Sequence, residues 1–107
     1  MAQIDVDTLS RIVDRYVAER SLRLSAGERL EIMRMAQGYA CKESANLAGI
    51  SYETIRARRK RVYRKLSVDG ATEVTSSLLR FSLLLMAAGQ RDARDLAPGA
   101  EATSNAP

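Results

Sequence analysis

The sequence predicts an all-α fold for this chain of 107 residues. Apolar residues recur at helical spacing along most of its length, and serine, aspartate and glycine stand where such helices would begin and end. A short helical segment, a glycine and a longer basic helical segment follow one another at 42–66. The apolar segment at 72–88 also follows helical spacing, but on two faces, so both faces must be buried.

The first expected helix covers residues 7–20, where the apolar side chains follow the i, i+3, i+4, i+7 pattern. Either Asp5 or Asp7 can cap its first turn. Charged residues occupy the other face, so the helix is amphipathic and is expected to pack on the rest of the domain. Its apolar stripe consists of Leu9, Ile12, Val13, Tyr16 and Val17.

Three further helices are expected before the apolar segment. Ser25 and Glu28 have capping-box spacing, which predicts a helix over 26–37 that ends before Gly38. A short helix at 42–48 ends at Gly49. Ser51 then caps a helix over 52–66. Its predicted buried stripe is Ile55, Val62 and Leu66.

The last expected helix covers 72–88. Val74, Leu78, Phe81 and Leu85 share one face, and Leu79, Leu83 and Met86 share another. One face would meet the chain's own domain. The other requires a second copy of the chain or the N-terminal helix. Residues 90–107 are polar, aperiodic and rich in Ala, and are predicted to form a mostly disordered tail.

Composition excludes several functional classes. The chain has one cysteine, Cys41, and no histidine, so neither an internal disulfide nor a zinc site of His and Cys ligands can form. Catalytic Ser-His and Cys-His pairs are excluded for the same reason. We therefore expect no enzyme activity, cofactor or metal. The apolar runs are too short to span a membrane and the N-terminus lacks a signal-peptide pattern, so a cytoplasmic protein is expected.

Positive charge is concentrated in "SYETIRARRKRVYRKLSV" at 51–68, which holds seven bases and one acid. The rest of the chain has ten bases and twelve acids, a net charge of −2. Such a run is usually a solvated helix face, but here no acids at i±4 neutralise it. The concentration indicates binding to a polyanion.

The order of short helix, glycine turn and longer basic helix is that of a helix-turn-helix, whose second helix enters the major groove of DNA. The sequence resembles the LuxR/GerE-type DNA-binding domain, a four-helix helix-turn-helix. The resemblance covers about residues 24–75 and rests on "LSAGER" at 24–29, "AQGYACKESANLAGIS" at 36–51, "TIRARRKRVYRKLSV" at 54–68 and "TEV" at 72–74.

The resemblance implies a sequence-specific transcriptional regulator that binds double-stranded DNA as a homodimer, associated with the nucleoid. The domain would span 24–89, with an added N-terminal helix in 1–23 and a lengthened apolar C-terminal helix. Relatives commonly carry a receiver or ligand-binding domain, and 1–23 is too short for one, so a stand-alone domain is expected.

The site residues that the resemblance implies fall in three groups. Base-reading residues are Arg56, Ala57 and Lys60; backbone-contacting residues are Lys42, Ser51, Tyr52, Thr54, Arg58, Arg61, Arg64 and Lys65; dimer-interface residues are Val74, Leu78, Phe81 and Leu85.

Three positions depart from the family pattern, which is usually apolar at the places of Glu31, Ser44 and Arg59. Arg59 lies four residues after Ile55, on or near the buried stripe, where a lone charge would be costly. One hypothesis is that Glu31 and Arg59 pair across two helices. The alternative is that the Arg59 side chain extends along the surface to a phosphate or to solvent.

Two other functions fit the same residues. The chain could be an interaction protein that pairs through its last helix with a larger regulator and modulates it; another transcription regulator or RNA polymerase is then the partner. It could also be a non-specific nucleoid protein, which would bind cognate and random DNA with little difference at fixed salt. The basic helix favours the first function, a homodimeric transcription factor.

Overall fold

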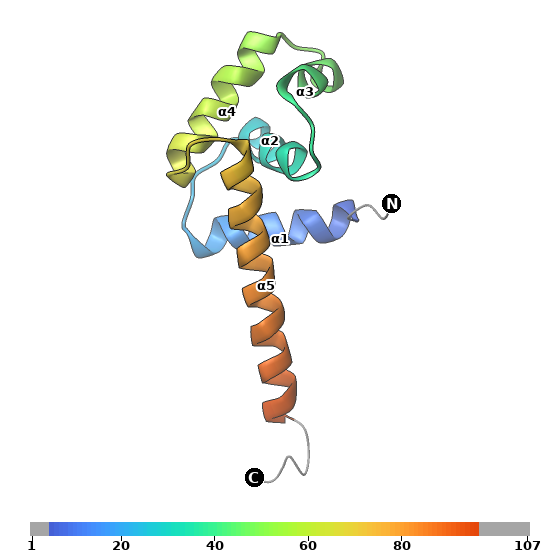
Figure 1. Ribbon diagram of the computed structural model, residues 1–107, viewed down its shortest axis with the longest axis vertical. Helices are drawn as coiled ribbons and strands as arrows, with labels where there is room; N and C mark the ends of the chain where they lie inside the picture. The colour runs from blue at the N-terminus through green and yellow to red at the C-terminus, as the bar shows by residue number, and fades with distance from the viewer. Residues whose placement is uncertain (1–4, 97–107) are drawn as a thin grey trace.

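The computed structural model describes residues 5–96, and within them the fold is all-α, as predicted (Figure 1). Four helices form a cluster, and the last projects from it as a long rod (Figure 1). The helices are α1 Val6–Glu19, α2 Ala26–Ala36, α3 Cys41–Ala48, α4 Tyr52–Leu66 and α5 Ala71–Leu96.

The predicted N-terminal caps are present. Asp5 accepts a hydrogen bond from the Thr8 backbone N–H at 3.1 Å and begins α1. At α2, the Ser25 hydroxyl accepts from the Glu28 N–H at 3.1 Å, and the Glu28 carboxylate accepts from the Ser25 N–H at 3.0 Å. Both halves of this capping box satisfy backbone donors that the helix itself leaves free.

Left-handed backbone ends two of the helices at glycine. Gly38 follows α2 with φ +90°, and Gly49 follows α3 with φ +68°. A β-carbon is unfavourable in this region of φ, so glycine suits both turns. The second turn connects α3 to α4, and the Ser51 hydroxyl accepts from the Thr54 N–H at 3.1 Å to begin α4.

Residues from four helices form the core. Val13 and Tyr16 of α1, Ile32 of α2, Val62 of α4 and Val74 of α5 are all fully buried. The Tyr16 hydroxyl shares a 2.7 Å hydrogen bond with the hydroxyl of Ser77 on α5. Its ring meets Phe81 edge-on, with ring centroids 5.4 Å apart. The N-terminal helix is therefore part of the same core as α2, α4 and α5, packed against both α2 and α5.

The last helix is longer than predicted, and part of its predicted dimer-interface face is buried. It continues to Leu96, so residues 90–96 are helical rather than the start of the predicted disordered tail. Residues 97–107, the rest of that tail, lie outside the described residues. Val74 and Leu78 are buried in the chain's own core, and Tyr16 of α1 contacts α5 at Ser77 and Phe81. The N-terminal helix thus covers one of the two apolar faces of α5.

Candidate nucleic-acid interface

Helix α4 is held by one face and exposed on the other. Ile55 and Val62 are fully buried and Leu66 nearly so, which confirms the predicted stripe. Helices α2 and α3 pack on this face, and α4 lies at the end of the molecule opposite the free end of α5 (Figure 1). On the opposite face of α4, the side chains are exposed within the part of the chain that the structure describes.

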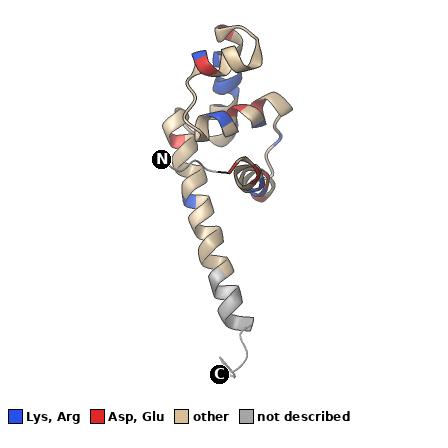
Figure 2. Cartoon of the chain, turned by 90° about the vertical axis from the view of Figure 1, so that its right-hand side faces the viewer, with Lys and Arg blue, Asp and Glu red and all other residues tan. Residues whose placement is uncertain are grey.

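The three predicted base-reading residues lie on that exposed face. Arg56, Ala57 and Lys60 are all exposed, as is Arg64 one turn further along. Within the described part of the chain, none of the three basic residues has an acidic partner within 4.0 Å. The Arg56 guanidinium lies over the ring of Tyr52, 5.8 Å from its centroid. The exposed cations of α4 that lack an acidic partner thus lie along one side of the helix; Figure 2 shows Lys and Arg in blue and Asp and Glu in red along the chain.

Two other basic residues of α4 are engaged by an acid of α2. Lys65 Nζ lies 2.7 Å from Glu28 Oε1, and Arg61 Nε lies 3.2 Å from Glu28 Oε2. Lys65 Nζ also donates to the Arg23 carbonyl oxygen at 2.7 Å. Arg61 and Lys65, both predicted to contact DNA backbone, therefore also tie α4 to the start of α2.

Glu28 was not among the predicted site residues. Its spacing from Ser25 indicated only the local capping box, and its contacts to α4 depend on how the two helices pack. Burial opposes its ionisation, but hydrogen bonds from Lys65, the Ser25 backbone and Arg61 outweigh burial and lower its pKa to about 2. The carboxylate is therefore charged over the whole neutral range.

The other predicted backbone contacts lie at the start of α3 and α4. Lys42 is exposed on the first turn of α3. Ser51 and Thr54 are exposed, and their hydroxyls share a 2.8 Å hydrogen bond within the cap of α4. Arg58 is half-buried against Gly27, where an added β-carbon would lie only 2.8 Å from Arg58 Cζ. A side chain at this position would therefore displace the flexible end of Arg58 from its place against α2.

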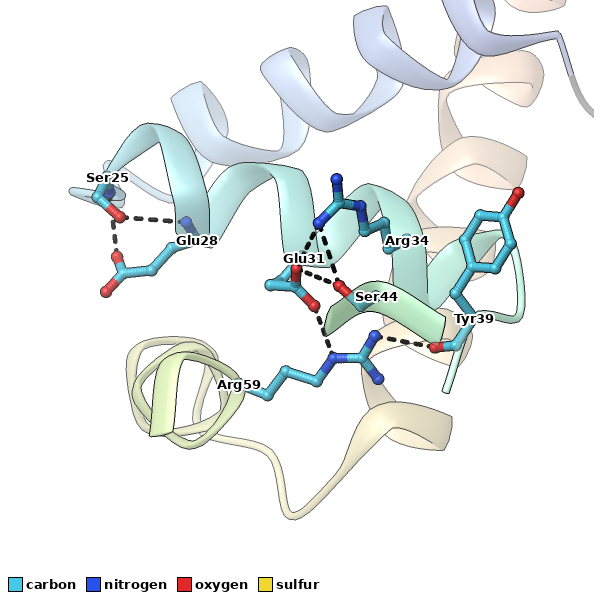
Figure 3. A network of polar contacts seen from close by, with 7 residues as sticks. All are labelled: Ser25, Glu28, Glu31, Arg34, Tyr39, Ser44 and Arg59. Carbon is cyan, nitrogen blue, oxygen red and sulfur yellow. Dashed lines mark hydrogen bonds and ion pairs between the residues drawn. The ribbon is translucent and has the colours of Figure 1, made fainter. Parts of the chain in front are cut away.

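Arg59 is buried in an ion pair with Glu31 (Figure 3). Its Nε lies 2.8 Å from Glu31 Oε1, and its side chain is 4% exposed. Its Nη2 donates to the Tyr39 carbonyl oxygen at 2.9 Å. The hypothesis that Glu31 and Arg59 pair is confirmed, and the alternative that Arg59 extends to solvent is wrong.

All three departures from the family pattern meet in this network. The Ser44 hydroxyl donates to Glu31 Oε2, and Arg34 Nη1 lies 3.1 Å from both Glu31 Oε2 and Ser44 Oγ. Burial alone would raise the pKa of Glu31, but hydrogen bonds from Ser44 and Arg59, with the charge of Arg59, hold it below its ordinary value. One ionised carboxylate thus joins α2, α3 and α4.

Tyr63 borders this network on the next turn of α4 and is half-buried. Burial raises the pKa of its hydroxyl, and the nearby Arg59 guanidinium partly opposes the rise. Tyr63 packs against the core, so it is a packing residue of α4 rather than part of the exposed basic face.

The predicted dimer-interface residues mostly face inward. Val74 is fully buried and Leu78 is 4% exposed. Phe81 packs on the core, and Leu85 is half-buried. Val74 and Leu78 are therefore not available to a partner while the core is intact. Among residues 71–89 of α5, the large apolar side chains that are most exposed are Leu79, Leu83, Leu84 and Met86.

No group of three or more metal-ligating side chains comes together among residues 5–89. No helix within residues 5–96 has both the length and the apolar character that a membrane crossing requires.

Comparison of the chain with protein-family models, with curated proteins and with solved structures found no match.

Proposed function

We propose that this protein is a sequence-specific DNA-binding transcriptional regulator that acts as a homodimer, with α4 as the recognition helix in the major groove. The observation that carries the proposal is the way the cations of α4 are divided. Arg59, Arg61 and Lys65 have acidic partners within the chain, whereas Arg56, Lys60 and Arg64 are exposed and have none among residues 5–89. The seventh cation, Arg58, also has no acidic partner there and is half-buried against Gly27.

The dimensions of α4 suit this role. Its 15 residues give a length of about 22 Å, and a helix of ordinary diameter fits the major groove. Arg56 and Lys60 lie four residues apart on one face and would meet base edges, with Ala57 allowing close approach or contacting a thymine methyl group. Arg64 and Lys42 would contact the flanking phosphates.

The chain's own acids support the same orientation. Glu28 and Glu31 pair with Arg59, Arg61 and Lys65. The exposed cations of α4 without an acidic partner therefore point away from α2, while Arg58 is half-buried against Gly27. A solvated face that only kept the protein soluble would not require this separation. A protein of this kind would act on DNA in the cytoplasm, at the nucleoid.

The exposed apolar side chains of α5 favour a second candidate, an interaction protein that pairs through α5 with a larger regulator. Leu79, Leu83, Leu84 and Met86 are each more than half exposed. A homodimer would use the same surface, so the two candidates differ in whether α4 itself must bind DNA.

Selection from a library of random DNA duplexes by the full chain tests the proposal. We expect an enriched sequence, bound at least a hundredfold more tightly than random DNA at the same salt concentration. Arg56→Ala with Lys60→Ala should abolish the enrichment. The matched control, Arg11→Ala with Arg23→Ala, removes the same charge from exposed positions outside α4 and should retain it.

The remaining outcomes separate the alternatives. Equal affinity for selected and random DNA would indicate a non-specific nucleoid protein. If Arg56→Ala with Lys60→Ala loses DNA binding while the chain still regulates in cells, the interaction protein is the correct assignment. No measurable DNA binding at low salt would contradict both DNA-binding functions.

A further inference from the structure

Two cations of α4, Arg61 and Lys65, lie at the border between its exposed face and α2. Arg61 is four residues after Ala57 and three before Arg64, so it shares a side of the helix with both of these exposed residues. Lys65 follows one turn after Arg61. Their side chains are 46% and 39% exposed, whereas that of Glu28, which they share, is 4% exposed. Both cations therefore border the surface that the proposed function assigns to DNA.

The Glu28 carboxylate is fixed in its place. Its Oε1 accepts a hydrogen bond from the Ser25 N–H at 3.0 Å, and the Glu28 N–H donates to the Ser25 hydroxyl at 3.1 Å. The capping box and burial together prevent the carboxylate from following the two cations toward solvent. Since its pKa is about 2, it is ionised near neutral pH. One negative charge is thus held beside Arg61 and Lys65.

These contacts leave the two cations poorly placed to bind a phosphate. Lys65 Nζ has three N–H donors and uses two of them, for Glu28 Oε1 and for the Arg23 carbonyl oxygen. The Arg61 Nε–H donates to Glu28 Oε2 at 3.2 Å. A phosphate bonded to either cation would lie within roughly 8 Å of the Glu28 carboxylate, a distance over which charges still interact at physiological salt. The two negative groups would therefore repel one another.

We propose that Glu28 restrains Arg61 and Lys65 and thereby limits the affinity of α4 for DNA of any sequence. This inference rests on the proposed function, in which α4 binds DNA. Phosphate contacts supply essentially all of the affinity for random DNA and carry no sequence information. Withholding two of them weakens binding at random sites, while Arg56 and Lys60 stay free to read base edges.

Affinity for a random DNA duplex, measured over a series of salt concentrations, tests the restraint. Glu28→Gln removes the negative charge, and the new amide oxygen can still accept from the Ser25 N–H, so the capping box is kept. We expect at least tenfold tighter binding at about 0.1 M salt, and a salt slope that is steeper by about 1–2, because one or two further phosphates are then contacted. Circular dichroism compares the helical content of the variant with that of the wild type.

Two further variants show whether the gain comes from the released cations. Glu19→Gln makes the same change of charge on α1, where Glu19 lies 3.9 Å from Arg15 in an exposed pair, and should leave affinity and slope unchanged. Glu28→Gln combined with Arg61→Ala and Lys65→Ala should return both quantities to the wild-type values, because the cations that the first substitution releases are then absent.

The Nε–H proton of Arg61 provides a measurement that leaves Glu28 in place, so it does not depend on whether the variant folds. This N–H is hydrogen-bonded to Glu28 Oε2, which slows its exchange with water. In the wild type we expect the slow exchange to persist when a random duplex is added. Fast exchange in the presence of DNA would show that Glu28 releases Arg61, and would overturn the restraint.

The outcomes separate this inference from the proposed function. If the wild type binds DNA and a folded Glu28→Gln variant binds it with the same affinity and slope, the restraint is wrong and the proposed function stands. Weaker binding by that variant would also overturn the restraint, because Glu28 would then position the cations for DNA. An equal gain in Glu19→Gln would reduce the effect to net charge and contradict it as well. If neither the wild type nor Glu28→Gln binds any duplex at low salt, both proposals fail.

Discussion

Glu31 of α2 and Arg59 of α4 form an ion pair inside the domain, with 2.8 Å between Glu31 Oε1 and Arg59 Nε. The pair joins α2 to α4, the helix that carries the exposed basic residues. Ser44 of α3 donates a hydrogen bond to the same carboxylate, so three helices share one anchor. The Glu31 carboxylate thereby reduces the repulsion between Arg59 and the other basic side chains of α4.

Removing the acid of this ion pair while leaving the arginine should lower the stability of the fold. Glu31→Leu leaves Arg59 buried without its acid and should lower the free energy of unfolding by about 3–5 kcal/mol. Replacing all three polar groups, as Glu31→Leu with Ser44→Ala and Arg59→Leu, should recover most of that loss because no buried charge stays unmatched except Arg34, which can reach solvent. Urea denaturation of both variants measures the difference. A triple variant less stable than Glu31→Leu would contradict this account.

Stability should fall in acid because of Glu28. Its folded-state pKa of about 2 lies below the ordinary value of 4.5, so the folded state favours the ionised form. The resulting stability is fully present above about pH 4.5 and is lost as the pH falls toward 2; Glu31, whose pKa is also lowered, adds to the loss.

The loss of stability in acid should be smaller in the Glu28→Gln variant, which has no carboxyl group to titrate at position 28. Lys65→Met should also reduce this loss, since Lys65 makes the strongest hydrogen bond that lowers the pKa of Glu28. Thermal unfolding from pH 2 to 7 provides the measurement. Identical acid profiles for the wild type and Glu28→Gln would show that Glu28 does not contribute.

The N-terminal helix should contribute to the stability of the whole domain. Tyr16 is fully buried, contacts Phe81 edge-on and shares a hydrogen bond with Ser77. Tyr16→Ala should therefore destabilise the protein by about 3–5 kcal/mol. Tyr52→Ala removes an exposed tyrosine and should change stability by less than about 0.5 kcal/mol. Equal effects of the two substitutions would mean that α1 packs only loosely on α5.

The exposed apolar face of α5 should mediate self-association. Leu83 and Met86 are 55% and 60% exposed. Leu83→Lys with Met86→Lys should convert a dimer to a monomer in sedimentation equilibrium without loss of helical content, because like charges would face one another across the interface. Ala18→Lys with Gln37→Lys adds the same charge at exposed positions on α1 and after α2, and should stay dimeric. A monomeric wild type at tens of micromolar would contradict the proposed homodimer.

Single cations of α4 should differ in their effect on DNA binding, if α4 binds DNA as proposed. Arg64 has no acidic partner within residues 5–89, so Arg64→Ala should reduce the salt slope of binding by about 1. Arg61→Ala should have a smaller effect because Arg61 is already paired with Glu28. Affinity measured over a range of salt concentrations gives both slopes, and equal slope changes would show that the Glu28 pair opens on binding.

Much of the fold could be predicted from the sequence because its signals are local. The capping spacing of Ser25 and Glu28, the turns at Gly38 and Gly49, and the stripe through Ile55 and Val62 depend on near neighbours along the chain. The structure contains all of them. The exposed positions of Arg56 and Lys60 follow from the same helical period, so the sequence alone placed the basic face of α4.

Tertiary packing decided the rest. Periodicity shows that α5 has two apolar faces but cannot say which one α1 meets, and Tyr16 of α1 meets the side of α5 with Ser77 and Phe81. The shared partner of Arg61 and Lys65 depends on the crossing of α2 and α4, which no spacing along the chain encodes. Arg59 is the clearest case: the sequence placed a charge near the core. Only the packing of α4 against α2 and the loop that follows it supplied the acid, Glu31, and the Tyr39 carbonyl oxygen that let the charge be buried there.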